Sequence, residues 1–154
     1  MSFRVAQIDH VELFVPDRRE AAKWYAEVLG LDPLPNAEKW AALPGGPLMI
    51  SPDGGRTKLA LFEGEPQGTR PTAGFHRVAF RVSGPDFLAF LVRADQLRLG
   101  ESRGPVTVVD HETAFSAYFA DPYGHRLEVT TYDHEVVRAA RRESTDGSPG
   151  GATA

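Results

Sequence analysis

The amino-acid sequence repeats one pattern, in which an alternating apolar stretch precedes a helical stretch and three short strand candidates. The first copy begins at residues 8–15, where apolar side chains take every second place, as in a half-buried strand. The second copy begins at residues 75–82 with the same alternation. One copy is too small to bury both faces of its own sheet. The repeat therefore predicts two units that share a curved sheet.

A predicted helix follows each alternating stretch. In the first copy, Asp17 and Glu20 form a capping pair at the start of the helix, and Gly30 provides a left-handed stop. In the second copy, residues 83–86 open the helix and Gly100 is expected to end it. Each helix carries an apolar stripe at helical spacing, which predicts one buried face.

Three strand candidates separated by Pro and Gly follow each helix. They lie near residues 38–43, 47–51 and 57–62 in the first copy and near 105–110, 113–120 and 125–131 in the second. We therefore expect an α+β fold of two βαβββ modules around a cup-shaped site, with the helices outside. The expected parts are modules at 1–65 and 75–132, a linker at 66–74, a C-terminal helix at 133–143 and a disordered tail at 144–154.

Composition limits the possible partners. The net charge of -4 argues against a nucleic-acid or anionic-membrane surface. No apolar run is long enough to span a membrane, and the N-terminal residues lack the apolar region of a secretory signal. The absence of cysteine excludes disulfides and thiolate ligands. These features predict a cytoplasmic location.

Three motifs occur in a fixed order along the two copies. They are His10-Val11-x-Leu13-x-Val15-x-Asp17, Trp24-Tyr25-x-x-Val28-Leu29-Gly30-Leu31, and Tyr118-Phe119-x-Asp121-Pro122-x-Gly124-x-Arg126-Leu127-Glu128. With these motifs the chain resembles the vicinal oxygen chelate superfamily, which includes glyoxalase I, bleomycin- and fosfomycin-resistance proteins and extradiol dioxygenases. The resemblance covers residues 5–132. It implies a homodimer, with sites formed within or between chains.

The resemblance also implies a divalent-metal site at four cup positions, on the first and last strand of each unit. His10 takes the first position and Glu128 the last. Ala60 stands where a carboxylate could be, so that position is not a ligand. Two imidazoles and one carboxylate would suit Fe(II) or Mn(II) first, with Ni(II) or Zn(II) as alternatives.

The fourth position depends on strand register. His76 is the obvious third ligand, but counting from Val82 places it on the helix-facing side, whereas Arg77 corresponds to His10. A bulge would turn His76 into the cup and complete the metal site. Without a bulge, Arg77 fills the cup, pairs with Glu128 or an anionic ligand, and no metal is needed.

Two further residues resemble the extradiol dioxygenase signature. His111 and Tyr118 would handle protons and orient a catechol-like substrate. Their alternative roles are structural, with Tyr118 in the core and His111 in a loop. The residues expected to contact substrate in the cup are Arg77, Glu12, Phe14, Ala60 and Phe62.

Three functions remain open from the sequence. The first is a metal-dependent enzyme of extradiol type acting on a small molecule with neighbouring oxygens. The second is a metal-free protein that sequesters a small molecule, as bleomycin-resistance proteins do. The third is a glyoxalase-type lyase or isomerase, which the alanine at position 60 disfavours. Outside the cup, we expect exposed positions for His125, His134, Arg138, Arg141 and Arg142.

Overall fold

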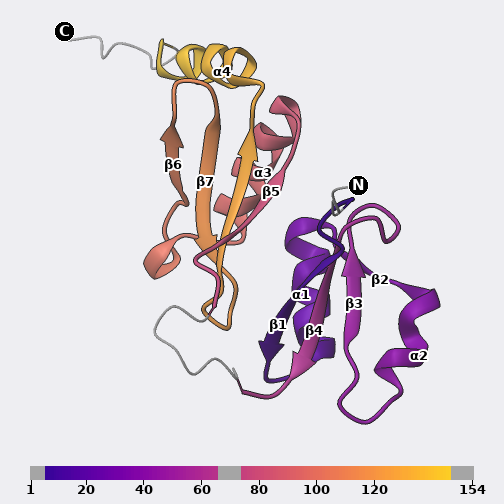
Figure 1. Ribbon diagram of the computed structural model, residues 1–154. Coiled ribbons are helices and arrows are strands. Elements are labelled where there is room, and N and C mark those ends of the chain that lie inside the picture. The colour runs from indigo at the N-terminus through magenta and orange to yellow at the C-terminus, as the bar shows by residue number, and fades with distance from the viewer. Residues whose placement is uncertain (1–5, 66–73, 147–154) are drawn as a thin grey trace, which may run out of the picture. The chain divides into compact units, whose positions relative to one another are not determined.

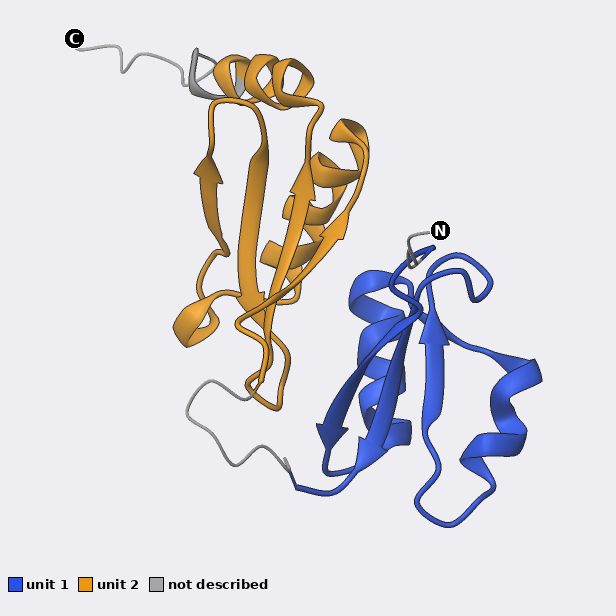
Figure 2. Cartoon of the chain, in the orientation of Figure 1, with its two compact units in different colours: residues 1–73 blue, residues 74–154 orange. Residues whose placement is uncertain are grey.

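The computed structural model describes residues 6–65 and 74–146, which fall into two compact units, Met1–Ala73 and Gly74–Ala154 (Figure 2). Each unit contains one four-stranded mixed sheet with a long helix packed on one face (Figure 1). The expected α+β class with two βαβββ modules is confirmed. Within the described residues, no helix combines the length and apolar character needed to cross a bilayer.

The first unit has strand order β1-β4-β3-β2, with β1 and β4 parallel and the other pairs antiparallel. Its elements are β1 (His10–Val15), α1 (Arg18–Leu29), β2 (Asp32–Pro33), η1 (Pro35–Ala37), α2 (Glu38–Ala41), β3 (Leu48–Ser51) and β4 (Lys58–Glu63). The parallel pair is the one that a helical crossover requires.

The second unit repeats this topology with strand order β5-β8-β7-β6 and a parallel β5–β8 pair. Its elements are β5 (Val78–Arg81), α3 (Gly84–Gln96), η2 (Glu101–Arg103), β6 (Thr107–Asp110), β7 (Phe115–Ala120), β8 (Arg126–Thr131) and α4 (His134–Asp146). α4 is the expected C-terminal helix, but it continues to Asp146 and so includes residues 144–146, which were expected in the tail. It lies across the end of this sheet (Figure 1). Residues 66–73 of the expected linker and 147–154 of the expected tail lie outside the described residues.

The helix starts are capped by the residues that the sequence indicates. The Asp17 carboxylate accepts a hydrogen bond from the backbone N–H of Glu20 at 3.0 Å, and Gly30 ends α1 with a φ of 66°. The Ser83 hydroxyl accepts from the backbone N–H of Asp86 at the start of α3. Only half of the expected capping pair forms, because the Glu20 side chain contacts Lys23 instead.

The strand expected near residues 38–43 is wrong, because α2 occupies most of this segment and η1 leads directly into it. Glu, Lys and Ala favour a helix over a strand, which explains the local conformation. The helical turn also buries Ala37 against Met49 and Ala60 on the sheet face that does not carry α1. Burial of this apolar face therefore reinforces the local helical preference.

A side chain of α1 fastens this segment. The guanidinium of Arg18 donates hydrogen bonds to the backbone carbonyls of Ala41, at 2.9 Å, and Gly46. These two carbonyls lie at the end of α2 and in the turn that follows it. Arg18 therefore ties the whole α2 segment to the first unit.

The expected helix end at Gly100 is also wrong. α3 ends at Gln96, and the left-handed residue beyond it is Arg98, with a φ of 53°. Gly100 has a φ of -73°, which any residue adopts. Glycine is required there because a Cβ would collide with the backbone carbonyl of Pro105.

Two histidines expected on the surface are mostly buried. The side chains of His125 and His134 are 19% and 11% exposed. Each lies 2.7 Å from a carboxylate oxygen, His125 from Asp121 and His134 from Asp110. A partner carboxylate allows an imidazole to be buried at low cost, and this partner is not evident from the sequence.

The β7–β8 turn is built around Asp121. One carboxylate oxygen accepts from the backbone N–H groups of Tyr123, at 2.9 Å, and His125, at 2.8 Å. Asp121 is 5% exposed, so water cannot replace it easily. This turn fixes the register in which Tyr118 faces Glu128.

We expect Asp121→Ala to lower the free energy of unfolding by about 2 kcal/mol, because two backbone donors lose their buried acceptor. Asp95→Ala is the matched control, since Asp95 is exposed on α3, and it should change stability by less than about 0.5 kcal/mol. Urea denaturation measures both values. Equal effects of the two substitutions would contradict this account of the turn.

The β3–β4 turn contains a carboxylate, Asp53, whose contribution to stability should depend on acid pH. Hydrogen bonds to the Asp53 carboxylate, chiefly from the backbone N–H of Thr57, lower the pKa of Asp53 from 3.8 to about 2. When folding lowers the pKa of a carboxyl, the resulting stability is fully present at a pH above the unfolded-state pKa. That stability is lost as the pH falls toward and through the folded-state pKa. We therefore expect Asp53→Asn to reduce the pH dependence of the unfolding temperature between pH 3.8 and 2. An unchanged acid profile would contradict this role for the carboxylate.

Candidate functional site

The second sheet has a polar face on the side away from α3. Leu127 and Val129 of β8 are buried toward α3, so Glu128 and Thr130 point to the other side. Glu128 pairs with Tyr118 of β7 and with Ala79 of β5, which places it between two neighbouring strands. Strand alternation thus collects polar side chains on one face.

Arg77 lies just before β5 and reaches Glu128. Its Nη1 atom is 3.9 Å from Oε2 of Glu128, and its guanidinium carbon is 4.2 Å from the ring centroid of Tyr118. The side chains of Arg77 and Glu128 are 28% and 18% exposed. The Nε–H of Arg77 is buried and has no hydrogen-bond partner among the described residues. The guanidinium therefore lies between a ring and a carboxylate, and its buried Nε–H group lacks an acceptor among the described residues.

The second oxygen of Glu128 is held by a hydroxyl. Ser116 Oγ donates to Glu128 Oε1 at 2.7 Å and lies 3.1 Å from Oγ1 of Thr130. Thr130 in turn donates to the backbone carbonyl of Phe115 at 3.2 Å. These contacts fix the Glu128 carboxylate. We call Arg77, Ser116, Tyr118, Glu128 and Thr130 the Arg77–Glu128 cluster.

The two candidate proton-transfer residues lie together at the edge of this cluster. His111 Nε2 is 2.9 Å from the hydroxyl of Tyr118. His111 follows β6, where its backbone N–H donates to the carbonyl of Ala114 at 2.8 Å. An imidazole at this distance can exchange a proton with a phenol. The pair is thus linked to Arg77 through the ring of Tyr118.

His76 does not contact Glu128 within the described residues. Its Nδ1 atom is 3.4 Å from Nη1 of Arg126, and the side chain is exposed. Val78 pairs with Leu127, which continues the regular alternation of β5. Of the two arrangements that register allows, the structure therefore has the one with Arg77 beside Glu128.

The candidate residues of the first unit lie on the face of its sheet away from α1. His10 contacts Asp9 at 2.8 Å and Glu12 at 3.3 Å. Phe14 and Phe62 face each other with ring centroids 6.2 Å apart.

Ala60 is fully buried on the same face, where it packs with Ala37 and Met49. The expected cup position at Ala60 is therefore covered by Ala37 of η1.

These placements test whether the second unit can hold a divalent metal. Both Glu128 oxygens already face donors, and one donor is a guanidinium, whose charge opposes a cation. Among residues 6–65 and 74–146, no three His, Cys, Asp or Glu side chains are grouped to bind a metal. The side chains of the Arg77–Glu128 cluster therefore do not fit a metal in this arrangement.

Sequence reasoning missed Ser116 and Thr130, the partners that hold Glu128. A signal for Ser116 is present, because it lies two residues before Tyr118 on the same strand and must share its face. Thr130 lies two residues after Glu128 and is placed by the same rule. Alternation on β7 and β8 would have found both.

Comparison with known proteins agrees with this topology. Residues 7–129 match the family model described as the Glyoxalase/Bleomycin resistance protein/Dioxygenase superfamily. No curated protein sequence matches the chain.

Three of the similar solved structures illustrate the range of functions on this fold. "Oxidase ChaP-H2" is 25% identical, with a TM-score of 0.59 over 83% of this chain and 94% of its own. Lactoylglutathione lyase from Agrobacterium tumefaciens is 21% identical, with a TM-score of 0.59 over 84% and 96%. Fosfomycin resistance protein FosX from Listeria monocytogenes, complexed with Mn(II) and sulfate ion, is 14% identical, with a TM-score of 0.60 over 90% and 99%.

The contacts of Arg77 lead to a stability prediction. We expect Arg77→Ala to lower the free energy of unfolding by about 1–2 kcal/mol, because Tyr118 loses a cation–π partner and Glu128 loses its neighbouring charge. Arg81→Ala is the control, because Arg81 is exposed at the end of β5 and lies over the exposed ring of Tyr132. Chemical denaturation should show at most about 0.5 kcal/mol for the control. No difference between the two would argue against the cluster.

Proposed function

Because the chain belongs to the glyoxalase/bleomycin resistance protein/dioxygenase superfamily, we propose that it binds a small oxygen-bearing molecule at the Arg77–Glu128 cluster without a metal ion. The observation that carries this proposal is the place of Arg77 beside Glu128 and over the ring of Tyr118. The guanidinium supplies the positive charge that a metal would supply in a metal-dependent relative.

The chemistry of the cluster indicates the kind of ligand. The Nε–H of Arg77 is a buried donor whose hydrogen bond is unmet, and such a donor is costly unless an acceptor reaches it. Tyr118 and His111 add a hydroxyl and an imidazole close by. An aromatic molecule with neighbouring oxygens, such as a catechol, would place those oxygens against the exposed part of the Arg77 guanidinium and the groups of Tyr118 and His111.

The proposed role is capture of the ligand, as in a drug-sequestering protein. Glu128 is held by Ser116 and Arg77, so it orients the guanidinium and accepts a ligand hydroxyl. A fixed charge and a fixed acceptor favour binding because little side-chain freedom is lost when the ligand arrives. We further propose that the protein acts as a cytoplasmic homodimer.

A second candidate function is metal-dependent oxidation of a catechol-like substrate, of the extradiol type. Two observations favour it: the hydrogen bond of 2.9 Å between His111 and Tyr118, and the 25% identity to a structure named as an oxidase. In that function, His10, Glu128 and His76 would hold the metal, with Fe(II) or Mn(II) preferred over Ni(II) or Zn(II). Arg77 would have to leave Glu128 for this site to form.

Elemental analysis and ligand binding together decide between these functions. Protein purified anaerobically, without chelator or affinity tag, should carry no stoichiometric Fe, Mn, Ni or Zn, and should bind catechol in isothermal titration calorimetry. Arg77→Gln should weaken catechol binding at least about tenfold, because a charge-assisted donor is lost.

The control is Arg81→Gln, which removes an equal charge from an exposed position at the end of β5 and should change the affinity by less than about twofold. Catechol binding that is absent, or that is equal in the two variants, would overturn metal-free binding. One Fe or Mn per chain would favour the oxidation function instead, and turnover of catechol under oxygen would then be the next measurement.

A further inference from the structure

A cavity of about 350 Å³ lies in the second unit, between strands β6 and β7 and helix α4. It is lined by Val108, Asp110, Phe115, Arg138, Arg141 and Arg142. Its volume is within the usual range for sites that bind small molecules. None of its lining residues belongs to the Arg77–Glu128 cluster.

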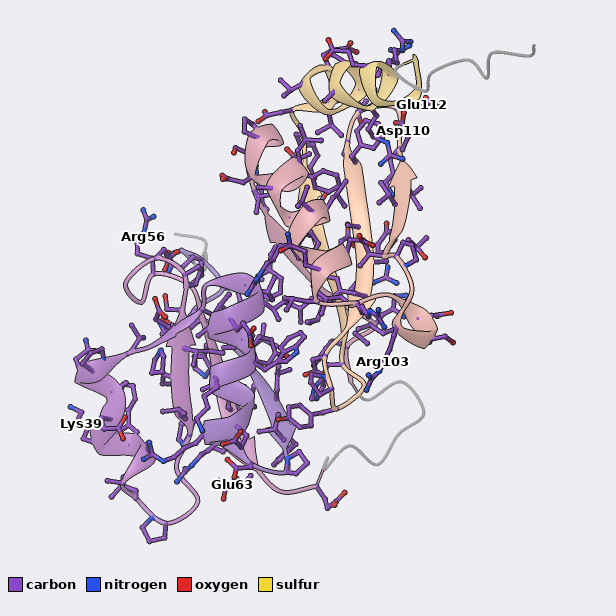
Figure 3. The ribbon with its side chains drawn as sticks, turned by 180° about the vertical axis from the view of Figure 1, so that it is seen from behind. Lys39, Arg56, Glu63, Arg103, Asp110 and Glu112 are labelled. Atoms are coloured by element: carbon purple, nitrogen blue, oxygen red, sulfur yellow. The ribbon has the colours of Figure 1, made fainter. Side chains whose placement is uncertain are left out.

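Strand alternation separates this cavity from the cluster. Val108 pairs with Ala117 and Asp110 pairs with Phe115, whereas Thr107 pairs with Tyr118. Residues in pairs share a face and successive residues alternate, so the cavity and Tyr118 lie on opposite faces of the sheet. Figure 3 shows Asp110 close to α4. A ligand in the cavity would not compete with one at the cluster.

The lining of the cavity carries more positive than negative charge, with three arginines against one carboxylate. Arg138, Arg141 and Arg142 are spaced three and four residues apart, which brings them to one side of α4. The acidic group is Asp110. One of its oxygens is 2.7 Å from Nε2 of His134 and accepts from the backbone N–H of Glu112 at 2.8 Å, and its negative charge also interacts with Arg138.

Helix α4 is anchored at its start, while its three arginines are exposed. The ring of His134 stacks on Phe115 with centroids 4.8 Å apart, and Val137 is fully buried. The Asp133 carboxylate just before α4 accepts from the backbone N–H of Gly84 at 2.7 Å. Three contacts at the start of the helix thus anchor it to the sheet and to α3.

We propose that this cavity is a second binding site, which takes a small molecule bearing a phosphate or carboxylate group. Guanidinium groups bind such oxyanions through paired, charge-assisted hydrogen bonds. Phe115 and Val108 form the apolar part of the wall, against which a carbon skeleton would pack. The Arg138–Glu135 pair, at 3.5 Å, is solvent-exposed and therefore weak enough to yield to a ligand.

Titration of the full-length protein with inorganic phosphate, and separately with citrate, tests this site. Amide NMR spectra recorded at constant ionic strength give both the affinity and the place of binding. The largest shifts should occur in β6, the start of β7 and α4. Tighter binding of inorganic phosphate would indicate a phosphate-bearing ligand, and tighter binding of citrate would indicate a carboxylate-bearing ligand.

The double substitution Arg138→Gln with Arg142→Gln should weaken binding of the better probe at least about tenfold. The control is Arg56→Gln with Arg103→Gln, which removes the same charge from exposed positions outside the cavity (Figure 3). Binding to the control should stay within about twofold of the parent protein. Absence of saturable binding, or equal weakening in both double variants, would overturn the site.

The result is independent of the function proposed for the Arg77–Glu128 cluster. Arg77→Gln should leave phosphate or citrate binding unchanged, while the Arg138–Arg142 double variant should leave catechol binding unchanged. Loss of both kinds of binding in either variant would contradict two separate sites. Circular dichroism of each variant confirms that α4 remains folded.

Discussion

The parallel pairing of the first and last strands in each unit is the constraint on which the structure depends. A helix must cross over between parallel strands, and it covers one sheet face, so each strand has a buried side and an opposite side. In the second unit, the pairing of Val78 with Leu127 sets which β5 residues face α3. The same register leaves Glu128 on the polar face, where Arg77 reaches it. Chemistry at this face thus follows from a backbone hydrogen-bond pattern.

Much of this fold could be read from local sequence. Alternation located the long strands, and Asp17 and Ser83 marked the helix starts, because each signal acts over a few residues. The strand expected around Trp40 is wrong because Glu, Lys and Ala favour a helix there, and packing of Ala37 on Met49, which is distant in sequence, reinforces that preference. Gly100 was misread for a similar reason, since its requirement comes from a close approach of Pro105.

The sequence could predict which main residues belong to the candidate site, but it could not predict the hydrogen bonds that hold them. Counting residues from Val82 gave the correspondence between Arg77 and His10, and the contact of Arg77 with Glu128 agrees with that count. Counting did not reveal that Ser116 holds the other oxygen, because a hydrogen bond between neighbouring strands depends on their pairing. The basic cavity beneath α4 was missed altogether. Its arginines are exposed on α4, as expected, but the sequence did not show that Val108 and Phe115 line the same cavity.

The burial of Ala60 has an evolutionary consequence. Duplicated modules begin as equals, and each can keep or abandon a ligand position. In the first module, the position that corresponds to Glu128 is Ala60, which is fully buried with Ala37 and Met49. A longer side chain there would have to displace Ala37 of η1, which is continuous with the α2 segment that Arg18 holds by two hydrogen bonds. A single substitution at position 60 is therefore not expected to create a carboxylate ligand, and the second module is the easier place for new chemistry to arise.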